Sequence, residues 1–190
     1  LVYFIFLVAI FFLFFNQYNN FSVTLFSLVS SISNIGFSFE SYNESNFIFL
    51  VLVIIGGSLF STSSGIRFLK IFLLTKFSLN ELVSHSKPKH VLLNKVLFSK
   101  VKIDLTDINK YFFTVIIFIM SLALLICFLT LFNIEFDDAF KLAILTLMNT
   151  VNSSLHGLEN LNFAEFSISL KYILIVFMII GRIEFISILI

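Results

Sequence analysis

The stretch GGSLFSTSSGIR at residues 56–67 decides the fold of this chain, because it places three glycines, five hydroxyl side chains and one arginine inside an apolar run. As one helix, the run at residues 47–74 would reach about 42 Å, against about 30 Å for the hydrocarbon core of a membrane. Backbone that is not helical survives at membrane depth only where protein covers it or a water-filled cavity solvates it. The sequence therefore predicts a membrane span that is broken at residues 56–67, as spans are at ion sites and gates.

A second interpretation of the same stretch is close helix packing. Small residues let two helices approach each other in a membrane, and the stretch contains four of them: Gly56, Gly57, Ser58 and Gly65. Close packing alone does not require so many hydroxyl groups in sequence. We favour the broken span, and close packing stays open as the alternative.

The overall composition is that of a protein that crosses a membrane several times. Of the 190 residues, 59% are hydrophobic and 12% are charged, the mean hydropathy is +1.07, and 28 residues are phenylalanine. A soluble domain carries about 25% charged residues. The net charge of +1 speaks against nucleic-acid binding, which needs a clustered basic surface on a water-exposed fold. The serines have no nearby histidine and aspartate in a catalytic order, so we expect no enzymatic activity.

The basic residues are concentrated in one linker. Nine of the twelve lysines and arginines lie from Arg67 to Lys110, a window that holds only three acidic residues. By the positive-inside rule, the linker at residues 76–109 faces the cytoplasm. Most of the remaining acidic residues then lie on the external side, namely Glu40, Glu44, Glu135, Asp137, Asp138, Glu159 and Glu165.

Apolar segments flank this linker on both sides, at residues 1–15, 47–74, 111–132 and 166–190. Only residues 111–132 form an uninterrupted, uncharged stretch of full spanning length. The first segment begins with leucine and lacks the basic flank and cleavage site of a signal peptide. The last segment is still apolar at its final residue. We therefore expect the chain to be part of a longer protein.

Two shorter stretches of intermediate polarity lie between the apolar segments, at residues 21–33 and 136–148. A helix of this length covers about 20 Å, which is too short to cross a membrane but suits a re-entrant helix. One shift of 115 residues superimposes Phe21 on Phe136 and also Asn34 on Asn149. The two stretches are thus internally related.

The sequence therefore predicts an all-α integral membrane protein built from two copies of one unit. Each unit consists of a span, a re-entrant helix and a second span. The first unit covers residues 1–75, the second covers residues 110–190, and the basic linker at residues 76–109 joins them.

A short turn of small and polar residues follows each re-entrant helix: NIGFS at residues 34–38 and NTVNS at residues 149–153. Such a turn can direct backbone carbonyl groups at a dehydrated cation. The carboxyl end of the preceding helix carries partial negative charge, which favours a cation at the same place. Gly36 permits a left-handed backbone in the first turn. The same composition also occurs in ordinary polar loops. We therefore base the interpretation as an ion filter on the position of each turn directly after a re-entrant helix.

Three motifs together resemble a known family. They are SISNIGFS at residues 31–38, IGGSLFSTSSGIRFLKIFLL at residues 55–74 and NFAEFSISLKYILIVFMIIGRIEF at residues 162–185. In this order, and with a basic linker between the second and the third, they are similar to the carboxyl-terminal half of the membrane pore subunit of the Trk/Ktr/HKT potassium-uptake superfamily. That family carries a G-G-x-x-x-S-T-x-G-G-I-K type sequence in its third unit and a G-R-L-E type sequence in its last helix.

The resemblance implies a pore built from four such units with one filter glycine each, so this chain would supply half of a pseudo-fourfold pore. The function implied is transport of potassium, or sodium, through a selectivity filter of backbone carbonyl groups. The transported ion is then the ligand, and no covalent cofactor is expected. The implied filter residues are Asn34, Ile35, Gly36 and Phe37 in one unit, and Asn149, Thr150, Val151 and Asn152 in the other.

The resemblance also implies a gate. The loop that obstructs the pore below the filter would comprise Gly56, Gly57, Ser61, Thr62, Ser63, Ser64 and Gly65, and Arg182 of the last helix would contact it. A guanidinium group at membrane depth needs hydrogen-bond acceptors, and the loop's carbonyl and hydroxyl groups are suitable. Alternatively, Arg182 pairs with Glu184 or extends to the cytoplasmic interface.

The sequence departs from the family pattern at two positions. Val151 stands where the family has the glycine of the fourth filter strand, and a β-branched residue at positive φ is a costly outlier. Ser64 stands at a glycine position of the gate loop, where it still offers a hydroxyl group.

The implied partners are the missing amino-terminal half or a homologous pore subunit, a second complete subunit in a homodimer, a cytosolic nucleotide-binding regulatory subunit, and membrane lipid. The implied location is the bacterial plasma membrane, with several spans. Two other functions stay open: a truncated, non-conducting membrane remnant, and a secondary transporter of a small solute.

Overall fold

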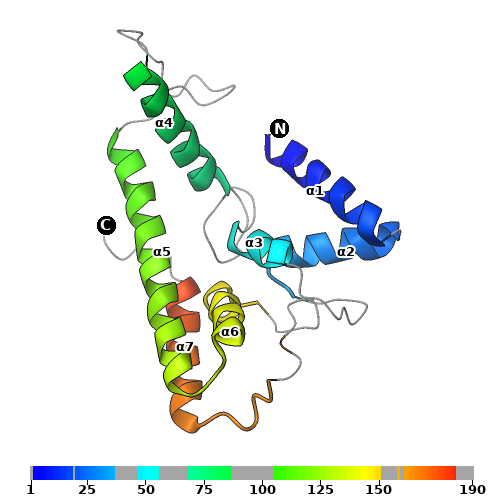
Figure 1. The fold of residues 1–190 in the computed structure, drawn as a ribbon, viewed down its shortest axis with the longest axis vertical. Helices are drawn as coiled ribbons and strands as arrows, with labels where there is room; N and C mark the ends of the chain where they lie inside the picture. Colours follow the sequence, from blue (N-terminus) through cyan, green and yellow to red (C-terminus); the bar gives the residue numbers. More distant parts are fainter. Residues whose placement is uncertain are drawn as a thin grey trace.

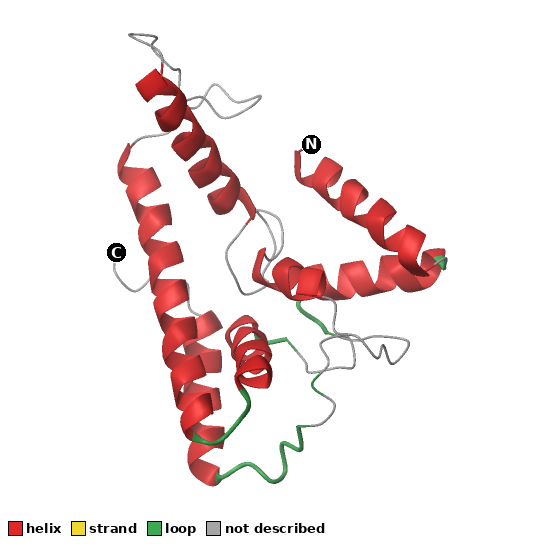
Figure 2. Ribbon diagram, viewed as in Figure 1, coloured by secondary structure: helices red, strands yellow, loops and turns green. Residues whose placement is uncertain are grey.

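The computed structural model describes residues 2–18, 20–36, 47–55, 68–86, 105–150, 158 and 161–182. Figure 2 shows that these residues form helices joined by turns and loops, with no strand in the described ranges. The all-α prediction is therefore confirmed. The helices are α1 (Val2–Tyr18), α2 (Phe21–Ile32), α3 (Phe47–Ile55), α4 (Phe68–Ser86), α5 (Leu105–Leu131), α6 (Phe136–Met148) and α7 (Ile168–Arg182).

The helix boundaries follow the hydrophobic pattern closely in most places. Helix α6 has the bounds expected for the second re-entrant helix, and α2 ends one residue before the expected end of the first. Helix α4 differs, because it continues to Ser86 and so passes through the boundary at residue 75 into the region assigned to the linker. Residues 56–67 and 87–104 lie outside the described ranges.

One described helix is long and apolar enough to cross a membrane. It is the part of α5 from Ile108 to Leu131, with a mean hydropathy of 3.0. Shorter apolar helices occupy Phe21–Ile32 and Ile168–Gly181. Most side chains in the spanning part of α5 remain accessible at the surface, as expected for a helix that faces lipid rather than the core of a soluble protein.

Helix α6 lies at the centre of one half of the molecule (Figure 1), where it packs against α3, α5 and α7. Helix α2 packs against α1 and α3 in the other half. Helix α3 therefore contacts both short helices and joins the two units, while α4 runs alongside one end of α5.

The apolar core is divided in the same way. The larger cluster surrounds α6, where Ala139, Ala143 and Ile144 are fully buried against residues of α3, α5 and α7. The smaller cluster joins α1, α2 and α3 through four buried residues: Ile10, Leu28, Phe49 and Leu52. Dispersion contacts of this kind hold helices together in a membrane, where lipid is as apolar as the helices themselves. Both short helices thus pack against α3, and α6 is the more deeply buried of the two.

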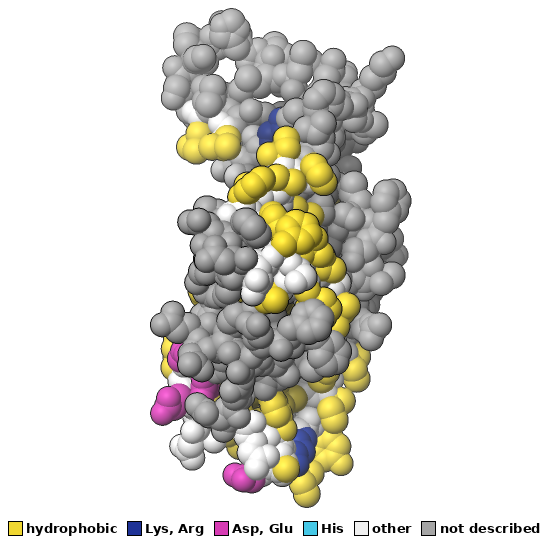
Figure 3. Space-filling model, turned by 90° about the vertical axis from the view of Figure 1, so that its right-hand side faces the viewer, with side chains coloured by type: hydrophobic (Ala, Val, Ile, Leu, Met, Phe, Trp, Pro, Cys, Tyr) yellow, Lys and Arg dark blue, Asp and Glu magenta, His cyan; other side chains and the backbone are white. Residues whose placement is uncertain are grey.

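The described acidic residues of the second unit gather at one end of the molecule. Asp137 and Asp138 lie in the first turn of α6, Glu135 precedes them, and Glu165 lies in the loop before α7. Figure 1 shows this end of α5, α6 and α7 opposite to the carboxyl end of α4, and Figure 3 shows acidic side chains there. That these acidic residues and the basic linker lie on opposite sides of a membrane stays a prediction.

Candidate ion-filter site

The turn that follows α2 has the geometry of a Schellman motif. Asn34 adopts a left-handed backbone with φ 57°, and its N–H donates to the carbonyl of Ser31 at 3.3 Å. The N–H of Ile35 donates to the carbonyl of Ser30 at 3.0 Å, and that of Gly36 donates to the same oxygen at 3.5 Å. Gly36 has φ 81°, a conformation that a side chain makes costly. The chain thus reverses sharply at the end of α2, at the place predicted for the filter.

The turn after α6 repeats this geometry 115 residues later. Asn149 has φ 54°, its N–H donates to the carbonyl of Thr146 at 3.2 Å, and the N–H of Thr150 donates to the carbonyl of Leu145 at 3.0 Å. The two units therefore end their short helices with the same turn, held by an asparagine in the same left-handed conformation. Asparagine tolerates this conformation better than most other residues that carry a side chain.

The exposure of the predicted filter residues differs along the turns. Asn34, Gly36 and Thr150 are buried, Asn149 is half-buried, and the side chain of Ile35 is 47% exposed. The other three predicted filter residues, Phe37, Val151 and Asn152, lie outside the described ranges.

The predicted gate falls almost entirely on residues that the structure does not describe. The loop at residues 56–67 is among them. Arg182 is the last residue of α7, and only its backbone is described. The gate therefore stays a prediction from the sequence. No group of three or more histidine, cysteine, aspartate or glutamate side chains in the described part of the chain could hold a metal ion.

The buried faces of the two short helices differ in polarity. In α2, four of the five buried residues carry hydroxyl groups, namely Thr24, Ser27, Ser30 and Ser31, and the fifth is Leu28. The residues of α6 that lie 115 positions later are Ala139, Leu142, Leu145 and Thr146, of which only the last is polar. The same backbone unit thus buries a mainly hydroxyl face in the first copy and a mainly alkyl face in the second.

Some of these hydroxyl groups have unused hydrogen-bonding capacity. Thr24 Oγ1 donates to the carbonyl of Asn20 at 2.8 Å, and Ser31 Oγ donates to the carbonyl of Ser27 at 2.9 Å. The hydroxyls of Ser27, Ser30 and Thr150 are buried and make no hydrogen bond to other described residues. Buried hydroxyl groups without partners are costly unless water or another ligand satisfies them. They place polar groups beside both predicted filter turns.

Two contacts attach the end of α6 to α7. The side-chain amide Nδ2 of Asn149 donates to the backbone carbonyl of Met178 at 2.9 Å. Close by, the backbone of α7 touches that of α6: a Cβ atom placed on Gly181 would lie 2.0 Å from the carbonyl oxygen of Leu147. Only glycine permits such an approach.

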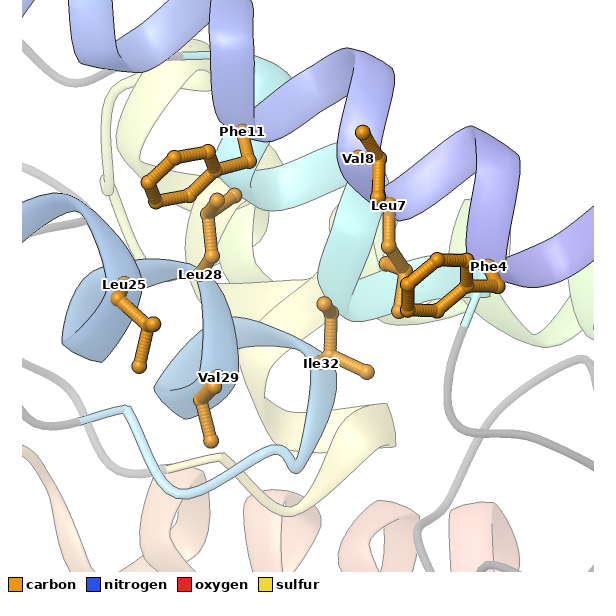
Figure 4. Close-up of a pocket in the computed structure, with 8 residues that line it drawn as sticks. All are labelled: Phe4, Leu7, Val8, Phe11, Leu25, Leu28, Val29 and Ile32. Carbon is orange, nitrogen blue, oxygen red and sulfur yellow. The ribbon is translucent and has the colours of Figure 1, made fainter.

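An apolar groove of about 340 Å³ lies between α1 and α2 (Figure 4). Helix α1 contributes Phe4, Leu7, Val8 and Phe11, and α2 contributes Leu25, Leu28, Val29 and Ile32. All eight residues that line the groove are apolar, so it has no group that would hold an ion. The groove reaches Ile32, the last residue of α2, two residues before the predicted filter turn begins.

The fold and the two turns define an all-helical arrangement in which two short helices, α2 and α6, each end in the same type of turn. Among solved structures, the chain is similar to the potassium transporter TrkH from Vibrio parahaemolyticus, with a TM-score of 0.79 and 23% sequence identity. The similarity covers 96% of this chain and 40% of the TrkH chain. The chain therefore has the fold of part of TrkH. That this part is the carboxyl-terminal half stays a prediction.

No protein-family model matches the sequence, and no curated protein matches it. At 23% identity, the structural similarity shows the fold and does not by itself show the activity.

Sequence reasoning identified both turns but missed the attachment of α6 to α7. Asn149 and Met178 are 29 positions apart, and no local pattern links an amide in a turn to a backbone carbonyl in a later helix. Gly181 carried a usable signal, because a single glycine inside an apolar helix often marks a close approach of two backbones. The resemblance implied a role for the neighbouring Arg182 instead.

Proposed function

We propose that the chain forms part of a pore that transports potassium, or sodium, across a bacterial plasma membrane. The observation that carries this proposal is the repeated turn, in which two short helices related by the internal repeat each end at a left-handed asparagine. The carboxyl ends of both helices present partial negative charge at these turns, which favours a cation. The similarity of fold to a potassium transporter supports the same function.

The proposed filter consists of backbone carbonyl groups at residues 34–37 and 149–152. Carbonyl oxygens can replace the hydration shell of a potassium ion, and the step needs no covalent chemistry. Because the resemblance implies four units, the chain would act with an amino-terminal half or a homologous pore subunit. Dimerisation of complete subunits and a cytosolic nucleotide-binding regulatory subunit belong to the same proposal.

The test is rescue of a potassium-uptake-deficient bacterium at low external potassium, together with ion flux into vesicles. The chain alone should not restore growth, because two units supply only half of a fourfold ring of carbonyl groups. Co-expressed with the half that completes the pore, it should restore growth and conduct potassium. Absence of flux from a folded, complete assembly would favour the non-conducting remnant. Uptake of an organic solute instead would favour the secondary transporter.

The proposed gate gives a separate prediction. Replacing Arg182 by alanine should raise cation flux in the complete assembly, because it removes a positive charge from below the filter. Arg182→Lys keeps the charge and is the matched control, so its flux should stay close to that of the unchanged protein. Loss of flux in the alanine variant, with the protein still folded, would mean that Arg182 is needed for ion passage and does not act as a gate.

A further inference from the structure

The end of α6 and the end of α7 are attached at two points that lie on one side of each helix. On α7, Met178 and Gly181 are three residues apart and so face the same way. On α6, Leu147 lies in the last turn and Asn149 in the turn that ends it. One point is a side-chain hydrogen bond and the other is contact between the two backbones. A two-point attachment fixes both the distance and the orientation of the α6 turn relative to α7.

The carbonyl oxygen of Met178, which accepts the hydrogen bond from Asn149, can accept two hydrogen bonds. Within a helix, the carbonyl of residue 178 accepts from the N–H four positions later. A carbonyl oxygen has two lone pairs, so it can accept the amide of Asn149 in addition. The bond therefore forms without disrupting α7.

The backbone of Asn149 does not by itself explain why asparagine stands there. Glycine satisfies φ 54° at least as well, and the N–H groups of the turn bond to α6 regardless of the side chain. What asparagine adds is an amide that reaches α7. The same left-handed conformation occurs at Asn133, at the end of α5, where the N–H groups of Asn133 and Ile134 likewise bond back to carbonyl groups of the preceding helix.

We propose that Asn149 is a positioning residue that holds the filter turn of the second unit against α7 through the carbonyl of Met178. Its side chain does not contact the ion, and it acts by fixing the orientation of Thr150, the next residue. Because Arg182 directly follows Gly181, the same turn of α7 also carries the proposed gate arginine. The consequence for ion selectivity rests on the proposed function, whereas the attachment itself does not.

The first experiment measures the attachment in the full chain in lipid nanodiscs. Asn149→Gly keeps the left-handed backbone and removes the amide, and Asn149→Asp keeps the shape and removes the donor. Amide hydrogen exchange of the segment from Leu145 to Thr150 should become about tenfold faster in both variants, in line with the loss of one hydrogen bond. Asn133→Gly and Asn133→Asp are matched controls and should leave this segment unchanged.

Unchanged exchange in both Asn149 variants would overturn the proposal, because the side chain would then not hold the turn. An equal increase in the Asn133 controls would also overturn it, since the effect would come from a general loosening of the fold. Retained helicity and a single species in size-exclusion chromatography establish that each variant is folded.

The second experiment measures potassium and sodium flux in vesicles that contain the complete assembly. Asn149→Gly should lower the potassium-to-sodium flux ratio severalfold while potassium still passes, and Asn133→Gly should leave the ratio unchanged. Faster exchange with an unchanged flux ratio would overturn the role in selectivity. If the unchanged assembly shows no flux, the proposed function fails, and the exchange experiment still decides whether Asn149 holds the turn.

Discussion

Replacing Gly181 by alanine is expected to destabilise the protein more than any other single methyl group added or removed on α7. The new Cβ would lie 2.0 Å from the carbonyl oxygen of Leu147, whereas a carbon and an oxygen atom in contact are normally about 3.3 Å apart. The atom that it meets belongs to the backbone of α6 and cannot rotate away. Overpacking costs about 1–3 kcal/mol, and we expect a loss near the upper limit, about 3 kcal/mol.

The measurement is the thermal unfolding midpoint in detergent. Val176→Ala is the control on the accessible face of α7, where the side chain is 51% exposed, and it should change the midpoint little. Leu147→Ala should not rescue Gly181→Ala, because it shortens a side chain and leaves the carbonyl oxygen in place. Equal midpoints for Gly181→Ala and Val176→Ala would show that α6 and α7 are not in backbone contact.

Replacing Gly36 by valine is expected to abolish potassium transport by the complete assembly. Gly36 is buried with φ 81°, and a β-branched residue in that conformation is strained by about 1–3 kcal/mol. The backbone would relax to negative φ and turn its carbonyl groups away from their present direction. Ile35→Val is the matched control, because residue 35 is half-exposed and does not have a positive φ.

The readout is growth of the uptake-deficient bacterium at low potassium, with flux ratios in vesicles. Gly36→Val should fail to support growth, and Ile35→Val should support it. Val151→Gly is the reverse change in the other unit and should improve discrimination of potassium over sodium. Normal transport by Gly36→Val would remove Gly36 from the filter, and an unchanged ratio in Val151→Gly would mean that the fourth filter strand is placed wrongly.

The sequence predicted those parts of the fold that depend on local pattern. The bounds of α6 followed from a stretch of 13 residues of intermediate polarity that ends at an asparagine. The turns after α2 and α6 followed from the internal repeat and from their small and polar residues, whereas the left-handed conformation of Asn34 and Asn149 was not predicted. The end of α4 did not follow, because the polar residues after residue 75 indicated a linker, whereas the helix continues to Ser86.

Contacts between residues that are far apart in the sequence could not be predicted from the hydrophobic pattern. The bond from Asn149 to Met178 depends on how α6 and α7 pack, and a periodicity does not specify which carbonyl faces a turn. The burial of Ser27 and Ser30 could not be predicted from the sequence either, since the sequence of a half-polar helix does not show whether its serines face solvent or protein. Burial depends on the neighbouring helices α1 and α3, which a single stretch of sequence does not contain.

The unequal faces of α2 and α6 have a consequence for symmetry. The two turns share backbone geometry, but two buried positions that carry hydroxyl groups in α2, Ser27 and Ser30, are occupied by Leu142 and Leu145 in α6. Hydroxyl dipoles reorient in response to a nearby charge, whereas alkyl groups polarise only weakly. Two backbone turns of equal shape therefore stand in media of different dielectric response. The hydroxyl face of α2 would therefore stabilise a nearby cation more strongly than the leucine side chains of α6.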